Sequence, residues 1–143
     1  MKYIEKQMDL FEVPKEYYII HCISADFQMN PGLSMAIDKK YDVKNNLFDN
    51  YKGLRFIYPL CLTTDRVISL STKANQDVET DRKDLAWCIY DMKRIMDSRG
   101  IKKIAMAKSC FDKTKWNEVK KILQDVFNDT DVEILVVYKG REK

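Results

Sequence analysis

The sequence is poor in the residues that build metal centres and thiol active sites. It contains one histidine and four cysteines, and no two cysteines stand in a C-x-x-C spacing. Zinc sites need clusters of these residue types at short spacings, and a Cys/His nucleophile pair needs both types in one site. We therefore expect no metal, no cofactor and no cysteine-based catalysis.

Long apolar runs are also absent. No stretch approaches the roughly 18 residues that a membrane span needs, and the polar N-terminal residues do not resemble a secretory signal. Three of the cysteines lie in apolar runs, where a buried, reduced thiol is the default. The net charge of +3 permits an anionic ligand but does not indicate nonspecific nucleic-acid binding. These features predict a cytoplasmic protein without a membrane partner.

The sequence does contain enough apolar residues for one core. Its 143 residues are 45% hydrophobic and 33% charged, which is ordinary for a globular protein. No repeat, low-complexity segment or linker divides the chain. We expect a single domain over residues 1–143, acting as a monomer.

The stretch from Tyr17 to Tyr41 organises the rest of the chain. Tyr17–Cys22 is an apolar run rich in β-branched and aromatic residues, which predicts a buried strand. After a polar loop, Asn30 is predicted to cap a helix and Pro31 to be its first residue. A strand that leads through a loop to a helix N-terminus can bind phosphate, because the first turn has unpaired N–H groups. An ordinary strand–helix connection is the alternative.

Strands and helices alternate along the remaining sequence. Pro59 indicates an edge strand or a bulge, and residues 54–72 are predicted to form a hairpin. Strands are predicted at 3–6, 54–62, 67–70, 101–107 and 132–138, and helices at 43–52, 81–99 and 114–128. This pattern predicts an α/β fold, with a mixed sheet covered by helices on both faces. Ligands of such sheets bind at the carboxyl ends of strands, where loops 23–30, 71–80 and 108–113 fall.

Residues 21–42, HCISADFQMNPGLSMAIDKKYD, resemble the first ligand loop of macro domains, which bind ADP-ribose. The resemblance is to the branch of terminal ADP-ribose protein glycohydrolase and macro-domain antitoxins, with a pattern of roughly HCxSxDxxMGAGIAxxFKKKF. The matching positions are His21, Cys22, Ser24, Asp26, Met29, Gly32, Lys39, Lys40 and Tyr41. The resemblance covers nearly the whole chain. It implies a three-layer α/β/α sandwich with a mixed, roughly six-stranded sheet.

The resemblance implies two catalytic residues. Lys73, in Leu-Ser-Thr-Lys, matches a lysine that attacks the anomeric carbon of the distal ribose. Only the neutral amine is a nucleophile, so this role requires burial or neighbouring cations. Asp112 matches an aspartate that shuttles a proton, and Trp116 fits the same pattern. From the residues alone, Lys73 reads equally as a solvated loop lysine and Asp112 as a helix cap.

The resemblance also implies a set of ligand contacts. Asp9 matches the aspartate that accepts a hydrogen bond from the adenine amino group, and Tyr138 matches an aromatic residue that packs on adenine. His21 lies within a strand and is expected to be structural. The implied ligand-binding residues are Asp9, Leu10, Ser24, Ala25, Asp26, Met29, Asn30, Pro31, Gly32, Leu33, Ser34, Ser71, Thr72, Ser109, Cys110, Phe111 and Tyr138.

The sequence departs from the family pattern in its phosphate loops. Ser109 and Phe111 stand where the family has two glycines, and Pro31 removes a backbone donor. Such changes either weaken phosphate binding or reshape the pocket for a different ADP-ribose derivative. Two functions therefore remain open. The first is an ADP-ribosyl hydrolase acting on modified protein acidic side chains or nucleic-acid bases, with ADP-ribose or an ADP-ribosylated protein or nucleic acid as partner. The second is a non-catalytic reader or sponge of ADP-ribose or a related nucleotide.

Overall fold

The computed structural model describes residues 1–111 and 116–140. Its strands are β1 (Lys2–Gln7), β2 (Tyr18–Ser24), β3 (Leu60–Thr64), β4 (Val67–Lys73), β5 (Lys103–Ala107) and β6 (Glu133–Tyr138). Its α-helices are α1 (Leu33–Tyr41), α2 (Val43–Tyr51), α3 (Arg82–Arg99) and α4 (Trp116–Phe127). Short 3₁₀ helices cover Leu10–Glu12 (η1), Lys52–Leu54 (η2) and Lys108–Phe111 (η3).

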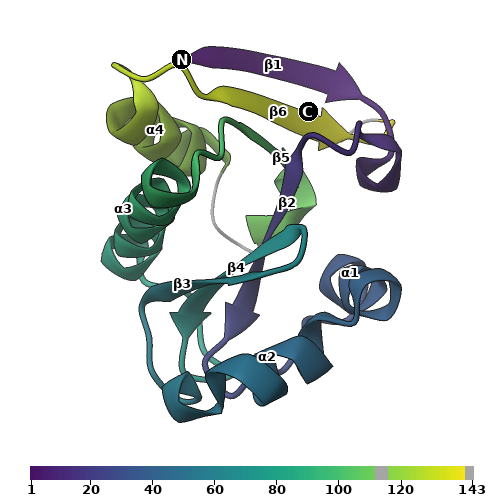
Figure 1. Ribbon diagram of the computed structural model, residues 1–143, viewed down its shortest axis with the longest axis vertical. Coiled ribbons are helices and arrows are strands. Elements are labelled where there is room, and N and C mark those ends of the chain that lie inside the picture. The colour runs from purple at the N-terminus through teal and green to yellow at the C-terminus, as the bar shows by residue number, and fades with distance from the viewer. Residues whose placement is uncertain (112–115, 141–143) are drawn as a thin grey trace.

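The strands form one six-stranded sheet in the order β1-β6-β5-β2-β4-β3. Strand β3 pairs antiparallel with β4, and every other pairing is parallel. Helices α1 and α2 lie on one face of the sheet, and α3 and α4 lie on the other (Figure 1). The predicted three-layer α/β/α sandwich with a mixed sheet is confirmed.

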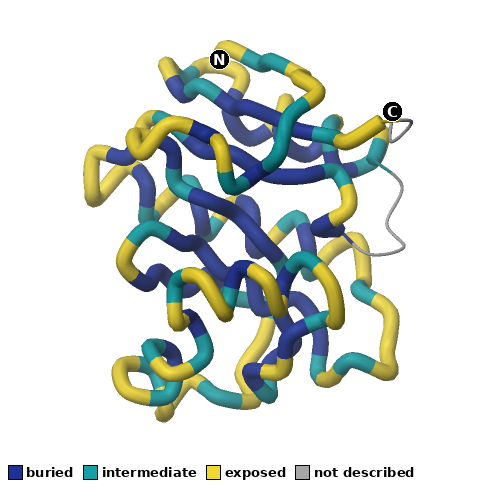
Figure 2. Tube along the Cα trace, turned by 90° about the vertical axis from the view of Figure 1, so that its right-hand side faces the viewer, coloured by how far each residue is buried: buried dark blue, intermediate teal, exposed yellow. Residues whose placement is uncertain are grey.

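The apolar periodicity of the sequence explains this packing. In β4 all seven residues are buried, as a central strand covered by helices on both faces requires. Helix α4 turns one apolar stripe to the sheet, formed by Val119, Ile122, Leu123, Val126 and Phe127. Figure 2 shows the result, with most strands buried inside and the exposed residues gathered on the helices, the connecting loops and the edge strand β1.

The prediction of a strand over residues 54–62 is wrong for residues 54–59. Strand β3 begins only at Leu60, after η2 and a loop. Pro59 has no N–H to donate to a ladder, and Phe56 adopts a positive φ of 71°, so neither residue continues a strand. The backbone N–H of Phe56 instead donates to the carbonyl of Ala25 (2.6 Å). The expected edge position is confirmed, because β3 is the last strand of the sheet.

The predicted cap of the first helix is also wrong. Helix α1 begins at Leu33 and its N-cap is Gly32, with a φ of 101°. Asn30 and Pro31 lie before the helix, because the first bond of the regular helical pattern runs from the N–H of Ala36 to the carbonyl of Gly32 (3.0 Å). The chain makes its turn into α1 at Gly32, where glycine has no Cβ to oppose the positive φ.

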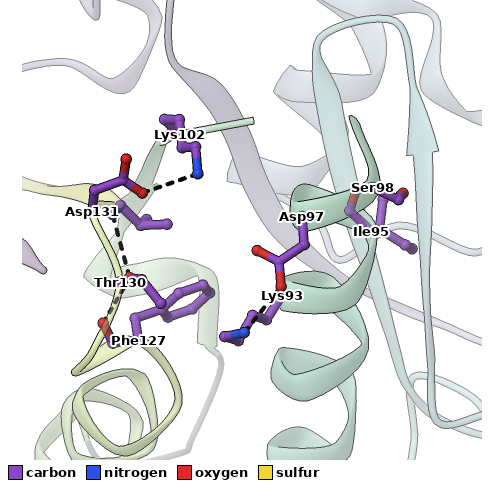
Figure 3. Close-up of polar contacts among 9 residues, drawn as sticks. Lys93, Ile95, Asp97, Ser98, Lys102, Phe127, Thr130 and Asp131 are labelled. Carbon is purple, nitrogen blue, oxygen red and sulfur yellow. Dashed lines mark hydrogen bonds and ion pairs between the residues drawn. The ribbon is translucent and has the colours of Figure 1, made fainter. Parts of the chain in front are cut away.

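The edge of the sheet where β5 and β6 begin carries surface polar contacts (Figure 3). Lys102 and Asp131, in the loops before these strands, form an ion pair of 3.0 Å. The hydroxyl of Thr130 donates to the carbonyl of Phe127 (2.7 Å) and closes the end of α4. Exposed ion pairs of this kind add little stability. Ligands of α/β sheets bind at the opposite side, where the carboxyl ends of the strands lie.

Candidate functional site

Five strands end at the same edge of the sheet. Strands β1, β2, β4, β5 and β6 are all parallel, so the loops that follow them share the carboxyl edge. Ligands of α/β sheets bind at such an edge. Two neighbouring pockets lie there: an Asp9 cleft and a Lys73 pocket. Loops 30–33 and 109–111 contribute residues to both.

The Asp9 cleft is the larger, with a volume of about 360 Å³. Asp9 follows β1 and caps η1, because its Oδ1 accepts the backbone N–H of Phe11 (2.9 Å). That bond and the ammonium of Lys139, 3.3 Å from Oδ2, hold the pKa of Asp9 below its usual range. Asp9 is therefore an ionised acceptor. The lining residues are Met8, Asp9, Leu10, Phe11, Gly32, Leu33, Ala36, Ala107, Ser109, Val137, Tyr138 and Lys139.

Tyr138 forms a wall of the Asp9 cleft at the end of β6. The ammonium of Lys108 lies 5.3 Å from its ring centroid, within cation–π range. Lys108 is itself held by Glu5, at 2.6 Å, and the Lys108 side chain is only 11% exposed. The ring of Tyr138 is thus supported by a largely buried ion pair.

The Lys73 pocket is small, with a volume of about 10 Å³, which is room for about one water molecule. It is lined by Cys22, Ile23, Asn30, Thr72, Lys73, Gln76, Thr80, Leu85, Cys110 and Phe111. Lys73 is the last residue of β4 and is only 7% exposed. The solvated-lysine alternative does not fit this burial.

A β-bulge sets the direction of Lys73. Along β2 and β4, Ile23 pairs with Ser71 but Ser24 pairs with Lys73, so Thr72 is an extra residue on β4. Bulges of this kind turn the following side chain to the other face, and they are common beside active sites. The backbone N–H of Ala25 donates to the carbonyl of Lys73 (2.7 Å) and fixes the strand end.

The loop after β2 is held by side chains rather than by regular pairing. The hydroxyl of Ser24 donates to Oδ1 of Asp26 (2.6 Å), which also accepts the N–H of Gln28 (3.1 Å). Nε2 of Gln76 donates to Oγ of Ser24 (2.7 Å). The buried Phe27 adopts a φ of 67°, an unusual conformation for a bulky side chain.

His21 lies fully buried in β2, under the first turn of α1. The hydroxyl of Ser34 donates to the carbonyl of Cys22 (3.3 Å), so Nδ1 of His21 donates to Ser34 (3.2 Å). Ser69 then donates to Nε2 (2.7 Å). Burial lowers the pKa of His21 to about 4, so the imidazole is neutral. These contacts give His21 the structural role expected from the sequence.

The structure brings most of the predicted site residues to one of the two pockets. Asn30, Thr72, Lys73, Cys110 and Phe111 line the Lys73 pocket, and Asp9, Leu10, Gly32, Leu33, Ser109 and Tyr138 line the Asp9 cleft. The predicted residues that line neither pocket are Ser24, Ala25, Asp26, Met29, Pro31, Ser34 and Ser71. Among them, Ser34 is turned inward to His21, and the hydroxyl of Ser71 donates to the carbonyl of Ile57 (3.2 Å). Asp112 lies outside the described residues.

Sequence reasoning missed several lining residues. Gln76 and Thr80 line the Lys73 pocket from a polar loop that carries no periodic signal. Phe11, Val137 and Lys139 line the Asp9 cleft and are direct neighbours of predicted residues. Extending the prediction by one residue along each of those segments would have found them.

Within residues 1–111 and 116–140, no group of three or more His, Cys, Asp or Glu side chains is placed to hold a metal ion. No helix in the described part of the chain is long and apolar enough to cross a membrane.

Comparisons with known proteins give the class of this fold. No family model matches the sequence. The macrodomain of Mycobacterium tuberculosis DarG superposes with a TM-score of 0.83 at 14% identity, over 96% of this chain and 98% of that one. Thermosipho africanus DarTG in complex with ADP-ribose superposes with a TM-score of 0.71 at 13% identity, over 99% of this chain and 42% of that one. The chain therefore has the fold of a macrodomain.

The chain also resembles two proteins in sequence, and their shared name states an activity. The chain is 27% identical to ADP-ribose glycohydrolase OARD1 of Homo sapiens over 130 residues, 90% of this chain and 86% of the relative. The Bos taurus protein of the same name matches equally well. The chain is thus similar in sequence to a glycohydrolase and in fold to the DarG macrodomains, as the resemblance of residues 21–42 implies.

Proposed function

We propose that this chain binds ADP-ribose and hydrolyses the bond between ADP-ribose and a modified carrier. The carrier is an acidic side chain of a protein or a base of a nucleic acid. One observation carries the proposal: Lys73 is buried in a pocket that neighbours the Asp9 cleft. The Lys73 pocket and the Asp9 cleft are together called the groove. Relatives named ADP-ribose glycohydrolase, and a structural neighbour in complex with ADP-ribose, support it.

The proposed ligand spans both pockets. Adenine occupies the Asp9 cleft, where the carboxylate of Asp9 accepts from the adenine amino group and Tyr138 offers a face for stacking. The diphosphate lies at Gly32, where the first turn of α1 offers unpaired N–H groups. The distal ribose then reaches Lys73.

The proposed reaction uses Lys73 as the nucleophile. Its neutral amine forms a bond to the anomeric carbon of the distal ribose, and the bond from that carbon to the carrier breaks, with the electron pair leaving on the carrier atom. Water then releases ADP-ribose and regenerates the amine. Asp112 moves the protons between the leaving group, the amine and the water. The burial of Lys73, which is only 7% exposed, supports this role.

The non-catalytic alternative is not favoured, because the sequence relatives are named as glycohydrolases. A cytoplasmic location, a monomeric state and independence from metal are further parts of the proposal. Cys61 and Cys88 are buried thiols that form no disulfide, and this supports a reducing compartment.

Calorimetry with ADP-ribose and with AMP, combined with a release assay on an ADP-ribosylated substrate, tests the proposal. We expect ADP-ribose to bind more tightly than AMP, and Lys73→Ala to bind ADP-ribose but release none from substrate. Lys93→Ala, which removes a half-buried lysine of α3, is the matched control. Absence of ADP-ribose binding would overturn the whole proposal, and unchanged turnover in Lys73→Ala would overturn its mechanism.

A further inference from the structure

One side chain joins the two loops that flank Lys73. Gln76 lies three residues after Lys73, and its Nε2 donates to Oγ of Ser24 (2.7 Å) and to the carbonyl of Gln28 (3.2 Å). Ser24 is the last residue of β2, and Gln28 lies in the loop that follows it. The two N–H bonds of the amide are therefore used to hold one ligand loop against the other.

The acceptors of Gln76 are themselves fixed. Ser24 is fully buried and donates to Asp26, and Asp26 also accepts the N–H of Gln28. The resulting network links Gln76, which lines the Lys73 pocket, to Ser24, Asp26 and Gln28. Such networks hold a geometry more firmly than their separate bonds.

A backbone hydrogen bond also joins Lys73 to the loop after β2. The N–H of Ala25 donates to the carbonyl of Lys73. Two cross-links therefore join this part of the chain to the residues around the end of β2. One is the backbone bond at the carbonyl of Lys73, and the other is the side chain of Gln76 three residues later. Lys73 and Gln76 line the same pocket.

We propose that Gln76 is a positioning residue that holds Lys73 in its reactive geometry by locking the loop after β4 to the loop after β2. This role rests on the proposed function of Lys73. Lys73 and Gln76 line the same small pocket, so a shift of either loop moves the amine relative to a ribose bound beside it. A displacement of about 1 Å costs on the order of 100-fold in rate.

Two variants remove the lock in different ways. Gln76→Glu keeps the length of the side chain but replaces the donor group by a carboxylate oxygen that faces the carbonyl of Gln28. Gln76→Ala removes the side chain. Asp77→Ala is the matched control, because Asp77 is exposed and its backbone N–H bond to Asn75 (2.9 Å) is retained.

Hydrogen exchange tests the lock without any ligand. We expect the N–H groups of Ala25 and Gln28 to exchange about 10-fold faster or more in both Gln76 variants, and at the unmodified rate in Asp77→Ala. Unchanged exchange in Gln76→Glu and Gln76→Ala would overturn the lock.

Kinetics test the consequence for Lys73. We expect kcat to fall by about 10- to 100-fold in both variants, with the dissociation constant for ADP-ribose changed less than about threefold. Faster exchange with an unchanged kcat, or a loss confined to ligand affinity, would overturn the positioning role. If the unmodified protein releases no ADP-ribose, the proposed function fails and the positioning role fails with it. The exchange result still decides whether Gln76 locks the loops.

Discussion

Asp9 uses its two carboxylate oxygens for different contacts. Oδ1 accepts the backbone N–H of Phe11 and so maintains the local turn, while Oδ2 faces Lys139, whose side chain is 72% exposed. An exposed ion pair adds little stability. The second oxygen can therefore exchange the lysine for the amino group of adenine without loss of the cap.

Asp9→Asn separates these two roles. Asparagine still caps η1, so we expect no measurable change in stability. The loss of a charged acceptor is expected to weaken ADP-ribose binding about 10-fold. Calorimetry with ADP-ribose and with ribose 5-phosphate checks this, because the second ligand has no adenine. An equal loss for both ligands would refute adenine recognition by Asp9.

His21 predicts how stability depends on pH. Its pKa in the folded protein is about 4, below the unperturbed value of about 6.5. The unfolded chain therefore binds more protons between these values, and the stabilising contribution is complete above pH 6.5 and lost as the pH falls toward 4. Over that window the contribution is about 3 kcal/mol.

His21→Gln removes this titration. Urea unfolding of both proteins at pH 7.5, 6 and 5 is expected to give a stability difference that shrinks as the pH falls, because all other groups titrate alike in the two chains. The variant is less stable at pH 7.5, since it disturbs a buried network with Ser34 and Ser69. A difference that stays constant from pH 7.5 to 5 would contradict the buried, neutral state of His21.

Helix α1 owes its starting point to one residue. Gly32 adopts a φ of 101° and a ψ of −118°, a conformation almost restricted to glycine. A Cβ built at Gly32 would meet nothing within 4 Å, so the cost of a substitution is conformational rather than steric contact with neighbours.

Gly32→Ala is expected to lower the free energy of unfolding by about 1–3 kcal/mol. It is also expected to weaken ADP-ribose binding, because the first turn of α1 shifts at the Asp9 cleft. Urea unfolding and calorimetry measure the two effects. Gly53→Ala is the control, because Gly53 has no positive φ and no atom near its built Cβ. Equal stability of the two variants would show that Gly32 carries no such strain.

The elements that the sequence predicted correctly are those with a strong periodic signal. Helix α3 begins after its Asp81 cap and ends before Gly100, as the pattern indicates, because both caps are local contacts. The errors at Asn30 and at residues 54–59 have another cause. There the backbone follows contacts between distant segments, such as the bond from Phe56 to Ala25.

The same distinction applies to the candidate site. The positions of Lys73, at the end of β4, and of Asp9, after β1, could be predicted because each stands at the carboxyl end of a strand in a family-like segment. The bulge at Thr72 depends on the register between β2 and β4, and the bonds of Gln76 depend on how two loops meet. A single sequence carries no signal for either.

At the scale of the whole molecule, Arg66 joins segments that are far apart in the chain. It lies in the turn between β3 and β4, at the edge of the sheet opposite the groove. Its guanidinium donates to the carbonyls of Val13 (3.2 Å), Pro14 (2.8 Å) and Tyr17 (3.1 Å), and to the hydroxyl of Tyr41 (3.2 Å). A planar group with five donors is suited to such a junction.

Arg66→Met keeps much of the apolar stem but removes every donor. We expect the free energy of unfolding to fall by about 2–3 kcal/mol, because part-buried carbonyls lose charged partners. ADP-ribose binding is expected to stay unchanged, since the groove lies at the other edge. Arg94→Met is the control: Arg94 is 71% exposed and bonds Asp91 on its own helix, so its loss is expected to cost less than about 0.5 kcal/mol. If Arg66→Met weakened ADP-ribose binding in proportion to its loss of stability, the two edges of the sheet would be coupled, and the groove would not be the preformed site that the parallel strand ends define.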